Sequence, residues 1–485
     1  MIRLFFHLLG FEFQRLGRSN MRLAAMAVFL LCGFYAISSG MHHLADWKNT
    51  LKELAERDAS QRTEAIGWFD DGVSGPEDRD WIDVTQIRYA DRFASAHAVM
   101  EPEPLAALAI GLSDIRSSWA VVSATRGAEP FRTSDPSTLG NAEKLLSGNF
   151  DLAFVLAYLT PLLLLVLMFD VGSMERDLGI LRTVRTQTAS PRAWWIFRVS
   201  LPILVVAFLV GVLLVIGGIR TEAIESSFEL WKTFSFASLG YVLLWGLLFS
   251  AVLSAGSGSS TAALWMVGLW ISFCVLVPAA VRQVVSSASP QLYASELTTV
   301  LRAERYEILL GELETYEQQF YADRPQLSAP TGEPDRATVS SMNRMIREAT
   351  FFAEVEVVDA KIAKREAIRE SAVALFGWIN PAYVFQNSLC VLAGTESINF
   401  RSHRRDILEA VKKRLESLID LQWKMDPIEK PAFVSLFAHE NWRKHGQMPD
   451  QSALLQGLTL AGAAFLSANF LARRKRSRER KTGIV

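Results

Sequence analysis

Two stretches of the sequence contain residue types that could bind a metal ion or a phosphate group. HENWRKH (439–445) has two histidines, but an HExxH zinc site needs its histidines four residues apart on one helical face. His439 and His445 are six residues apart and would point in different directions. GSGSS (256–260) resembles a phosphate loop only in composition, because the chain lacks GxxxxGKS or GxxxxGKT. We therefore expect a short turn at 256–260, and no metal, cofactor or nucleotide site in this chain.

The other reactive side chains are also not arranged as a catalytic motif. The three cysteines, Cys32, Cys274 and Cys390, form no CxxC pair, so neither a disulfide framework nor a zinc ribbon is expected. We expect Cys390 to be free and buried. His42 and His43 follow an apolar block and are expected at the membrane surface. No Ser–His–Asp arrangement is visible as a motif, so the sequence supports an enzyme poorly.

A polar segment between two apolar blocks has a spacing that could position a contact with another protein. It reads FDVGSMERDLGILRTVRTQTASPRAWWIFRVSL (169–201), with charges at 175–177, a turn at 179–181 and a proline at 191. The two tryptophans after the proline are typical of a membrane interface. The segment is either a solvated loop or a rigid turn that touches a partner. The proline and the two tryptophans fix the point at which the chain re-enters the membrane interface, and this favours the rigid turn.

The elements that would position this segment are membrane-spanning helices. Half of the 485 residues are hydrophobic and 21% are charged, and the apolar residues gather in blocks. A helix that crosses a bilayer needs about 20 apolar residues. Six blocks without a charged residue meet or approach this length: 23–40, 152–169, 199–219, 234–254, 261–281 and 453–472. The sequence predicts an all-α integral membrane protein with six transmembrane helices, the second of which occupies 151–169.

Basic residues predict the orientation of the chain, because they concentrate on the cytoplasmic side of membrane proteins. They precede the first span, fill the tail 473–485 and recur through the loop 170–198, but are sparse in 220–233. Both termini and the 170–198 loop are therefore expected in the cytoplasm. A cleaved signal peptide is the alternative reading of the first block. Residues 1–22 are expected to form an interfacial helix, or else a cytoplasmic extension of the first span.

Two long regions then fall on the extracytoplasmic side, at 41–150 and 282–452. In the first, we expect a helix at 46–66 that continues the first span, and an irregular acidic loop at 67–104. In the second, apolar residues at helical spacing predict two long helices, 292–320 and one after the proline-rich link 324–335. Their apolar seam is expected to form the core of a helical hairpin. Shorter helices are expected at 380–394 and 403–424.

Three of these segments resemble ABC-2 type transporter permeases, in particular a subgroup with a large extracytoplasmic helical domain of unknown function. The turn after the second span resembles the family pattern E-R-x-x-G-x-L at Glu175, Arg176, Gly179 and Leu181. Residues 141–170 resemble the entry to the second span of the subgroup. INPAYVFQNSLCVLAGT (379–395) resembles its S-P-x-x-x-x-Q-x-x-x-x-x-A-G-T segment, with Asn380 in place of the serine.

The resemblance implies a permease subunit of an ATP-binding-cassette exporter in a bacterial inner membrane. The turn would be a coupling helix that docks on a separate ATPase subunit, which binds the ATP and magnesium. The permease would pair with a second copy or a related permease. The cargo would be hydrophobic or peptide-like, and nucleic acid is not expected as a partner. Uncharged spans also argue against a proton-coupled carrier, which needs ionisable groups at mid-depth.

The last span supplies a possible face for pairing two permeases. Gly457, Ala461, Ala464 and Ala468 are spaced so that another helix could approach closely. Packing within one chain would use the same small residues, so both readings stay open. A different class of function also stays open: a membrane-anchored scaffold or sensor whose outer helices recruit a periplasmic partner. The 170–198 turn distinguishes this scaffold from an exporter.

Overall fold

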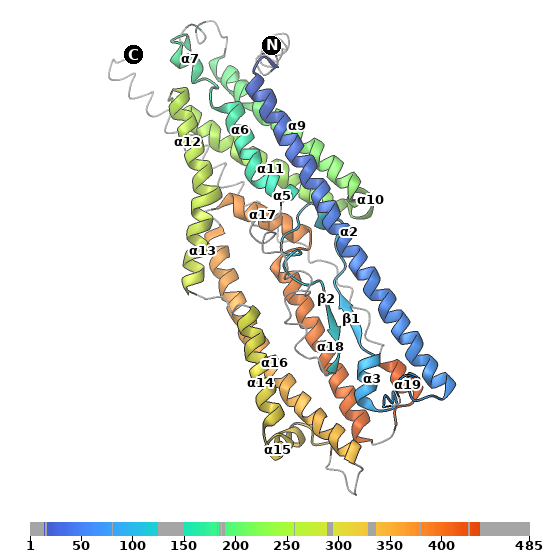
Figure 1. Ribbon diagram of the computed structural model, residues 1–485. Coiled ribbons are helices and arrows are strands. Elements are labelled where there is room, and N and C mark those ends of the chain that lie inside the picture. Colours follow the sequence, from blue (N-terminus) through green and yellow to red (C-terminus); the bar gives the residue numbers. More distant parts are fainter. Residues whose placement is uncertain are drawn as a thin grey trace.

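The computed structural model describes residues 14, 17–79, 81–124, 150–181, 183, 186, 190–256, 258–288, 294–327, 336–377, 380–424 and 427–436. The molecule is elongated, and most helices run along its length (Figure 1). The last apolar block (453–472), its small-residue face and the basic tail lie outside the described residues. So does nearly all of the expected interfacial helix 1–22. These expectations stay predictions.

Four helical stretches are long and apolar enough to cross a membrane, and a fifth apolar helix, Leu152–Met168, is shorter. The four are Asn20–Asp71, Trp194–Arg220, Phe228–Ser254 and Ser259–Ser287. They correspond to helices α2 (Asn20–Asp71), α9 (Pro191–Arg220), α11 (Phe228–Ser254) and the run α12 (Ser259–Ile271) to α13 (Val277–Ala288). α10 (Ala223–Ser226) links α9 to α11. The chain is therefore a multi-pass helical membrane protein.

Helix α2 continues without a break from the first apolar block into the polar region that follows it. Its 52 residues contain no proline, and it ends at Gly72, whose φ of 68° gives the left-handed cap that glycine adopts easily. The expected helical continuation through 46–66 is confirmed. One rigid element therefore connects the membrane domain to the far end of the molecule (Figure 1).

The second apolar block contains a π-helical turn close to a proline. In the second block, α5 (Leu152–Phe154) passes through the π turn Val155–Leu159 into α6 (Thr160–Met168). Pro161 has no N–H to donate to the carbonyl of Ala157, four residues earlier. The Tyr241 hydroxyl donates to that oxygen instead, at 2.8 Å. Trp270 Nε1 donates to the Tyr158 carbonyl at 3.1 Å. Neighbouring helices thus satisfy carbonyls that a regular helix would pair internally.

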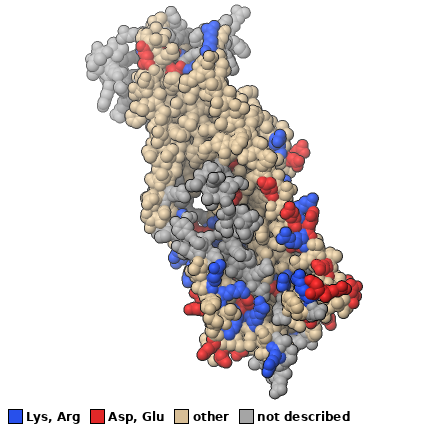
Figure 2. All heavy atoms as spheres, viewed as in Figure 1, with Lys and Arg blue, Asp and Glu red and all other residues tan. Residues whose placement is uncertain are grey.

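The half of the molecule away from α6 and α9, here called the distal domain, has its own core. It contains α3 (Ile87–Phe93), α14 (Ala294–Leu310), α15 (Leu313–Asp323), α16 (Arg336–Gly377), α18 (Ser397–Trp423) and α19 (Lys430–Ser435). Strands β1 (Ala96–Val99) and β2 (Trp119–Val122) pair antiparallel, with Ala96 opposite Val122. The expectation of an irregular loop over 67–104 was therefore wrong for α3 and β1. In Figure 2 the charged side chains gather mainly over this domain.

The first helix of the expected hairpin is broken into two. α14 ends at Leu310 and α15 starts at Leu313, so the expected single helix to residue 320 was wrong. Gly311 stands at the break, and Arg347 of α16 donates to its carbonyl at 3.0 Å and also to the carbonyl of Ile308. A side chain from the partner helix therefore satisfies carbonyls that the break exposes. Leu309, in the last turn of α14, is 63% exposed.

Helix α17 (Pro381–Leu392) belongs to the core of the membrane domain although its neighbours in sequence belong to the distal domain. Its Phe385 stacks on Tyr241 of α11 with ring centroids 4.0 Å apart. Gln386 accepts a hydrogen bond from the Tyr158 hydroxyl at 2.9 Å. Asn380 caps the helix by accepting from the amides of Ala382 and Tyr383. The expected helices at 380–394 and 403–424 are confirmed as α17 and α18.

The junction of the two domains is built from close backbone contacts. A Cβ added at Gly40 of α2 would lie 1.7 Å from the Ala107 carbonyl oxygen, in the 3-10 helix Pro104–Ala107. A Cβ at Gly111, where φ is +56°, would lie 2.6 Å from the Thr395 hydroxyl. Thr395 donates to the Ala109 carbonyl at 2.7 Å. The segment around 105–112 therefore fixes α2 against the end of α17.

The buried His403 of α18 predicts that the distal domain loses stability in acid. Burial lowers the pKa of its imidazole to about 4, with Asp406 opposing the shift. The unfolded chain takes up a proton near pH 6.5 but the folded protein does not, so stability should fall as pH drops from 6.5 through 4. The loss should approach about 3 kcal/mol. Thermal unfolding of the full chain against pH, compared with His403→Gln, measures it.

Comparing the wild type with His403→Gln separates the effect of His403 on stability from the effects of other titrating groups. Burial raises the pKa of Glu348 to about 7, which makes stability fall as pH rises from 4.5 through 7. This opposite effect is present in both proteins and cancels in their difference. The His403→Gln profile should therefore be flatter on its acidic side. Parallel profiles between pH 6.5 and 4 would contradict the prediction.

Candidate functional site

The turn that the sequence singled out lies at the end of the molecule where α2 begins (Figure 1). We call residues 170–181 the end turn. It contains the short helix α7 (Met174–Asp177) between two glycines with positive φ, Gly172 at 72° and Gly179 at 70°. A Cβ at Gly172 would lie 2.3 Å from the Trp195 ring. Glycine is therefore required there, both for the backbone conformation and for the approach of the tryptophan.

Two buried ion pairs attach the end turn to neighbouring helices. Asp170 pairs with Arg22 near the start of α2, and Glu175 pairs with Arg198 of α9. The Arg198 guanidinium also lies 5.2 Å from the ring centroid of Trp194. The side chains of both pairs are at most 13% exposed. Removing one partner of such a pair would leave a buried charge uncompensated, so the turn is held firmly to α2 and α9.

Two weaker contacts attach the end turn to α11 and α12. Arg176 Nη1 donates to the Leu253 carbonyl near the end of α11, at 3.4 Å. The Ser259 amide at the start of α12 donates to Asp177 Oδ2 at 2.9 Å, and the Ser259 hydroxyl donates to the same oxygen. These hydrogen bonds lower the pKa of the Asp177 carboxyl. Ser259, the first residue of α12, therefore anchors Asp177. A displacement of the end turn would act on four helices together.

The tip of the end turn exposes apolar side chains. Met174, Leu178 and Ile180 are 44%, 59% and 45% exposed. They surround a backbone that is held by ion pairs, so the surface that they form is fixed in place. A rigid apolar tip at the end of a helical bundle is suited to contact with another protein. The described contacts hold an exposed apolar surface in a fixed position.

The four residues matched to the family motif do not form this surface. The Glu175 carboxylate pairs with Arg198 within the bundle, and Arg176 reaches back to α11. Gly179 closes the turn, and a Cβ added there would meet no other atom within 4 Å. Leu181 is half-buried. These residues position the end turn. Sequence reasoning missed Met174, Leu178 and Ile180, although apolar residues around a charged triplet in a loop were a usable signal.

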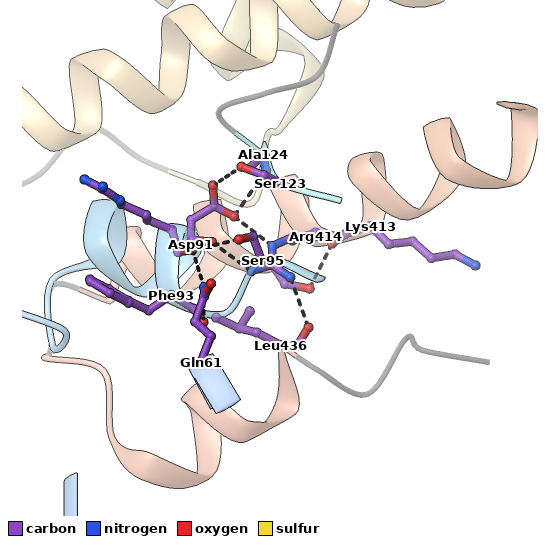
Figure 3. Close-up of polar contacts among 11 residues, drawn as sticks. Gln61, Asp91, Phe93, Ser95, Ser123, Ala124, Lys413, Arg414 and Leu436 are labelled. Atoms are coloured by element: carbon purple, nitrogen blue, oxygen red, sulfur yellow. Dashed lines mark hydrogen bonds and ion pairs between the residues drawn. The ribbon is translucent and has the colours of Figure 1, made fainter. Parts of the chain in front are cut away.

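A second polar centre, in the distal domain, has the residue types of a reactive site but is fully paired. Arg414 Nε donates to Asp91 Oδ1 at 2.7 Å, and its other nitrogens donate to the carbonyls of Asp91 and Leu436 (Figure 3). Ser123 and the Ala124 amide also donate to the Asp91 carboxylate. Burial would raise the pKa of Asp91, but the arginine and these hydrogen bonds hold it below its ordinary value. The cluster joins α3, β2 and α18.

The remaining candidates for chemistry are also accounted for by structure. His43 Nε2 lies 2.8 Å from Ser113 Oγ, but Ser113 donates its proton to the Ile110 carbonyl at 2.7 Å. The hydroxyl is therefore a poor nucleophile for that histidine. Among the described residues, no group of three His, Cys, Asp or Glu side chains could hold a metal ion. HENWRKH (439–445) lies outside them. The end turn is the best candidate for a functional site.

Comparison of the chain with models of known families, with curated proteins and with solved structures finds no match.

Proposed function

We propose that the chain is the permease subunit of an ATP-binding-cassette exporter, and that the end turn docks on a separate ATPase subunit. The observation that carries the proposal is the anchoring of the end turn to α2, α9, α11 and α12 beneath an exposed apolar tip. A solvated loop has no need of two buried ion pairs to hold it. A turn that transmits a partner's motion to several spans needs such ion pairs, because it must be held rigidly against those spans.

The proposal places the end turn and both termini in the cytoplasm of a bacterial cell, with the distal domain on the other side of the inner membrane. Two permease copies, or this chain and a related permease, would face two ATPase subunits. The described spanning helices bury no charged side chain at mid-depth, which suits an apolar or peptide-like cargo. ATP and magnesium would be bound by the ATPase alone.

Co-purification tests the proposal most directly. The chain is expressed with its neighbouring genes and solubilised in mild detergent. The mass and composition of the purified complex are then measured. An ATPase subunit at one copy per permease is the expected result. A chain that arrives alone, or only with a protein that binds the distal domain, would replace the proposal with a membrane-anchored scaffold.

Leu178→Arg should separate the ATPase from an intact permease. Leu178 is 59% exposed, so the change leaves the fold untouched but puts a charge at the centre of the proposed contact. Loss of one central apolar anchor costs about 1–2 kcal/mol or more, so affinity should fall about tenfold. Titration of the purified ATPase onto permease in nanodiscs measures the affinity. Val73→Arg, at an exposed site far from the turn, is the matched control.

The structure also shows why Glu175 is a poor test of docking. Lysine at position 175 would face the buried Arg198, so Glu175→Lys should disrupt the spans before it reports on a partner. If the Leu178→Arg and wild-type proteins bind the ATPase with equal affinity, the tip of the end turn is not part of the contact.

A further inference from the structure

Helix α14 of the distal domain has apolar residues on two opposite faces. Leu301 and Ile308 are 3% and 6% exposed and pack in the core with α16. On the other side, Tyr306, Leu309 and Leu310 are 63%, 63% and 68% exposed. A contiguous apolar face on a helix is normally covered by another element. The second face of α14 therefore needs a partner, because α14 lies in the charged domain and not among the apolar spans.

The exposed face of α14 has the spacing of one heptad of a two-stranded coiled coil. Ala303, Tyr306 and Leu310 follow a three-four spacing, which makes them a, d and a positions. Arg302 then occupies a g position and Glu307 the following e position. In a parallel pair of identical helices, g of one helix meets the next e of the other, five residues on. Arg302 and Glu307 would therefore form an ion pair across the seam in both directions.

Neither charged residue has another role within the described structure. Both side chains are exposed. No ion pair joins either of them to another described residue, whereas Arg305, on the side toward α16, pairs with Glu348 at 2.7 Å. The pattern is self-complementary, which favours a second copy of the same helix over an unrelated partner.

The spanning helix on the same side of the molecule is also the least covered. In the stretch Ser259–Ser287, 11% of the most apolar part is buried, against 28% to 56% in the other three spans. Its Leu264 and Trp265 are 73% and 64% exposed. Figure 1 places α12, α13 and α14 one after another along one edge. A second copy beside this edge would meet α14 as well as the span. Both copies have the same orientation in a membrane, so their α14 helices would be parallel.

We propose that the exposed face of α14, formed by Ala303, Tyr306 and Leu310 with Arg302 and Glu307, pairs in parallel with the same face of a second copy. The inference rests on the proposed pairing of two permeases but not on the ATPase. Through this seam, the distal domain contributes to the contact between two permeases outside the bilayer. The seam is short, so it adds to contacts within the membrane and does not replace them.

Site-specific disulfide formation in native membranes tests the seam. Core positions of a parallel coiled coil bring Cα atoms within the 4.4–6.8 Å range that a disulfide needs. Tyr306→Cys and Leu310→Cys, each alone, should give a covalent dimer under mild oxidation. Lys413→Cys on α18 is an equally exposed control and should stay monomeric, as should the wild type, whose three cysteines are buried or half-buried.

Two further measurements decide the interpretation. Arg302→Glu should reduce the Leu310→Cys dimer at least threefold, and adding Glu307→Arg should restore it. The mass of the wild-type protein in mild detergent is recorded in parallel. A dimeric mass without a disulfide at Tyr306→Cys or Leu310→Cys would overturn the α14 seam and leave the proposed function standing. A monomeric mass, with no disulfide at either position, would overturn the seam and the pairing of two copies of this chain, while co-purification with the ATPase tests the proposed function separately. A disulfide to a different protein would also overturn the seam.

Discussion

Replacing Arg414 by alanine should unfold the distal domain under conditions in which the wild type is folded. The side chain is 3% exposed and donates to the carboxylate and carbonyl of Asp91 and to the carbonyl of Leu436. Its removal leaves the fully buried Asp91 charge without its cation. Breaking a buried pair in this way costs about 3–5 kcal/mol. Thermal unfolding of the purified chain, with circular dichroism as readout, measures the loss.

Neighbouring variants separate the ion pair from a general effect of substitution. Lys413→Ala changes the next residue, which is 59% exposed, and should leave the unfolding temperature unchanged. The double variant Asp91→Leu with Arg414→Met removes both charges and should recover part of the stability, because no buried charge is left uncompensated although the Ala124 amide loses its acceptor. If Arg414→Ala and Lys413→Ala melt at the same temperature, the cluster is not what holds α3, β2 and α18 together.

Gly40→Ala should destabilise the junction between the two domains, although alanine favours a helix more than glycine does. The new Cβ would lie 1.7 Å from the Ala107 carbonyl oxygen, which is backbone and has no flexible side chain to move. Such overpacking costs about 1–3 kcal/mol and shifts the backbone. We expect a lower unfolding temperature in detergent and faster cleavage by added protease between the domains.

Gly67 of the same helix supplies the matched control. A Cβ at Gly67 meets no atom within 4 Å, so Gly67→Ala only gains helix propensity. That gain is about 0.5–1 kcal/mol. The two substitutions are chemically identical and should act in opposite directions. A Gly40→Ala protein at least as stable as Gly67→Ala would mean that α2 does not contact the 3-10 helix as described.

The elements that depend on local sequence could be predicted well. Uncharged apolar blocks mark spans because a single charge at mid-bilayer is costly, and the helix predicted at 46–66 as a continuation of the first span is part of α2. The N-cap of α17 at Asn380 and the end of α15 at Asp323, just before the proline-rich link, follow from residue type in the same way. These signals are all carried by neighbouring residues.

The contacts that depend on distant residues could not be predicted. The break at Gly311 is stabilised by Arg347, 36 residues away, so a regular apolar spacing in 292–320 gave no warning of it. Burial of α17 among the spans depends on Tyr158 and Tyr241. The motif match identified Glu175 correctly as part of a turn, but its partner Arg198 decides that the carboxylate faces the bundle.

The uninterrupted length of α2 makes it a lever arm. At 1.5 Å per residue, 52 residues span about 78 Å, well beyond a bilayer core of about 30 Å. Near one end, Arg22 pairs with Asp170; near the other, Asp58 bonds His97 at 2.7 Å and Asp70 bonds Lys430 at 2.5 Å. A tilt of about 5° at the first end would therefore carry the far end through roughly 7 Å.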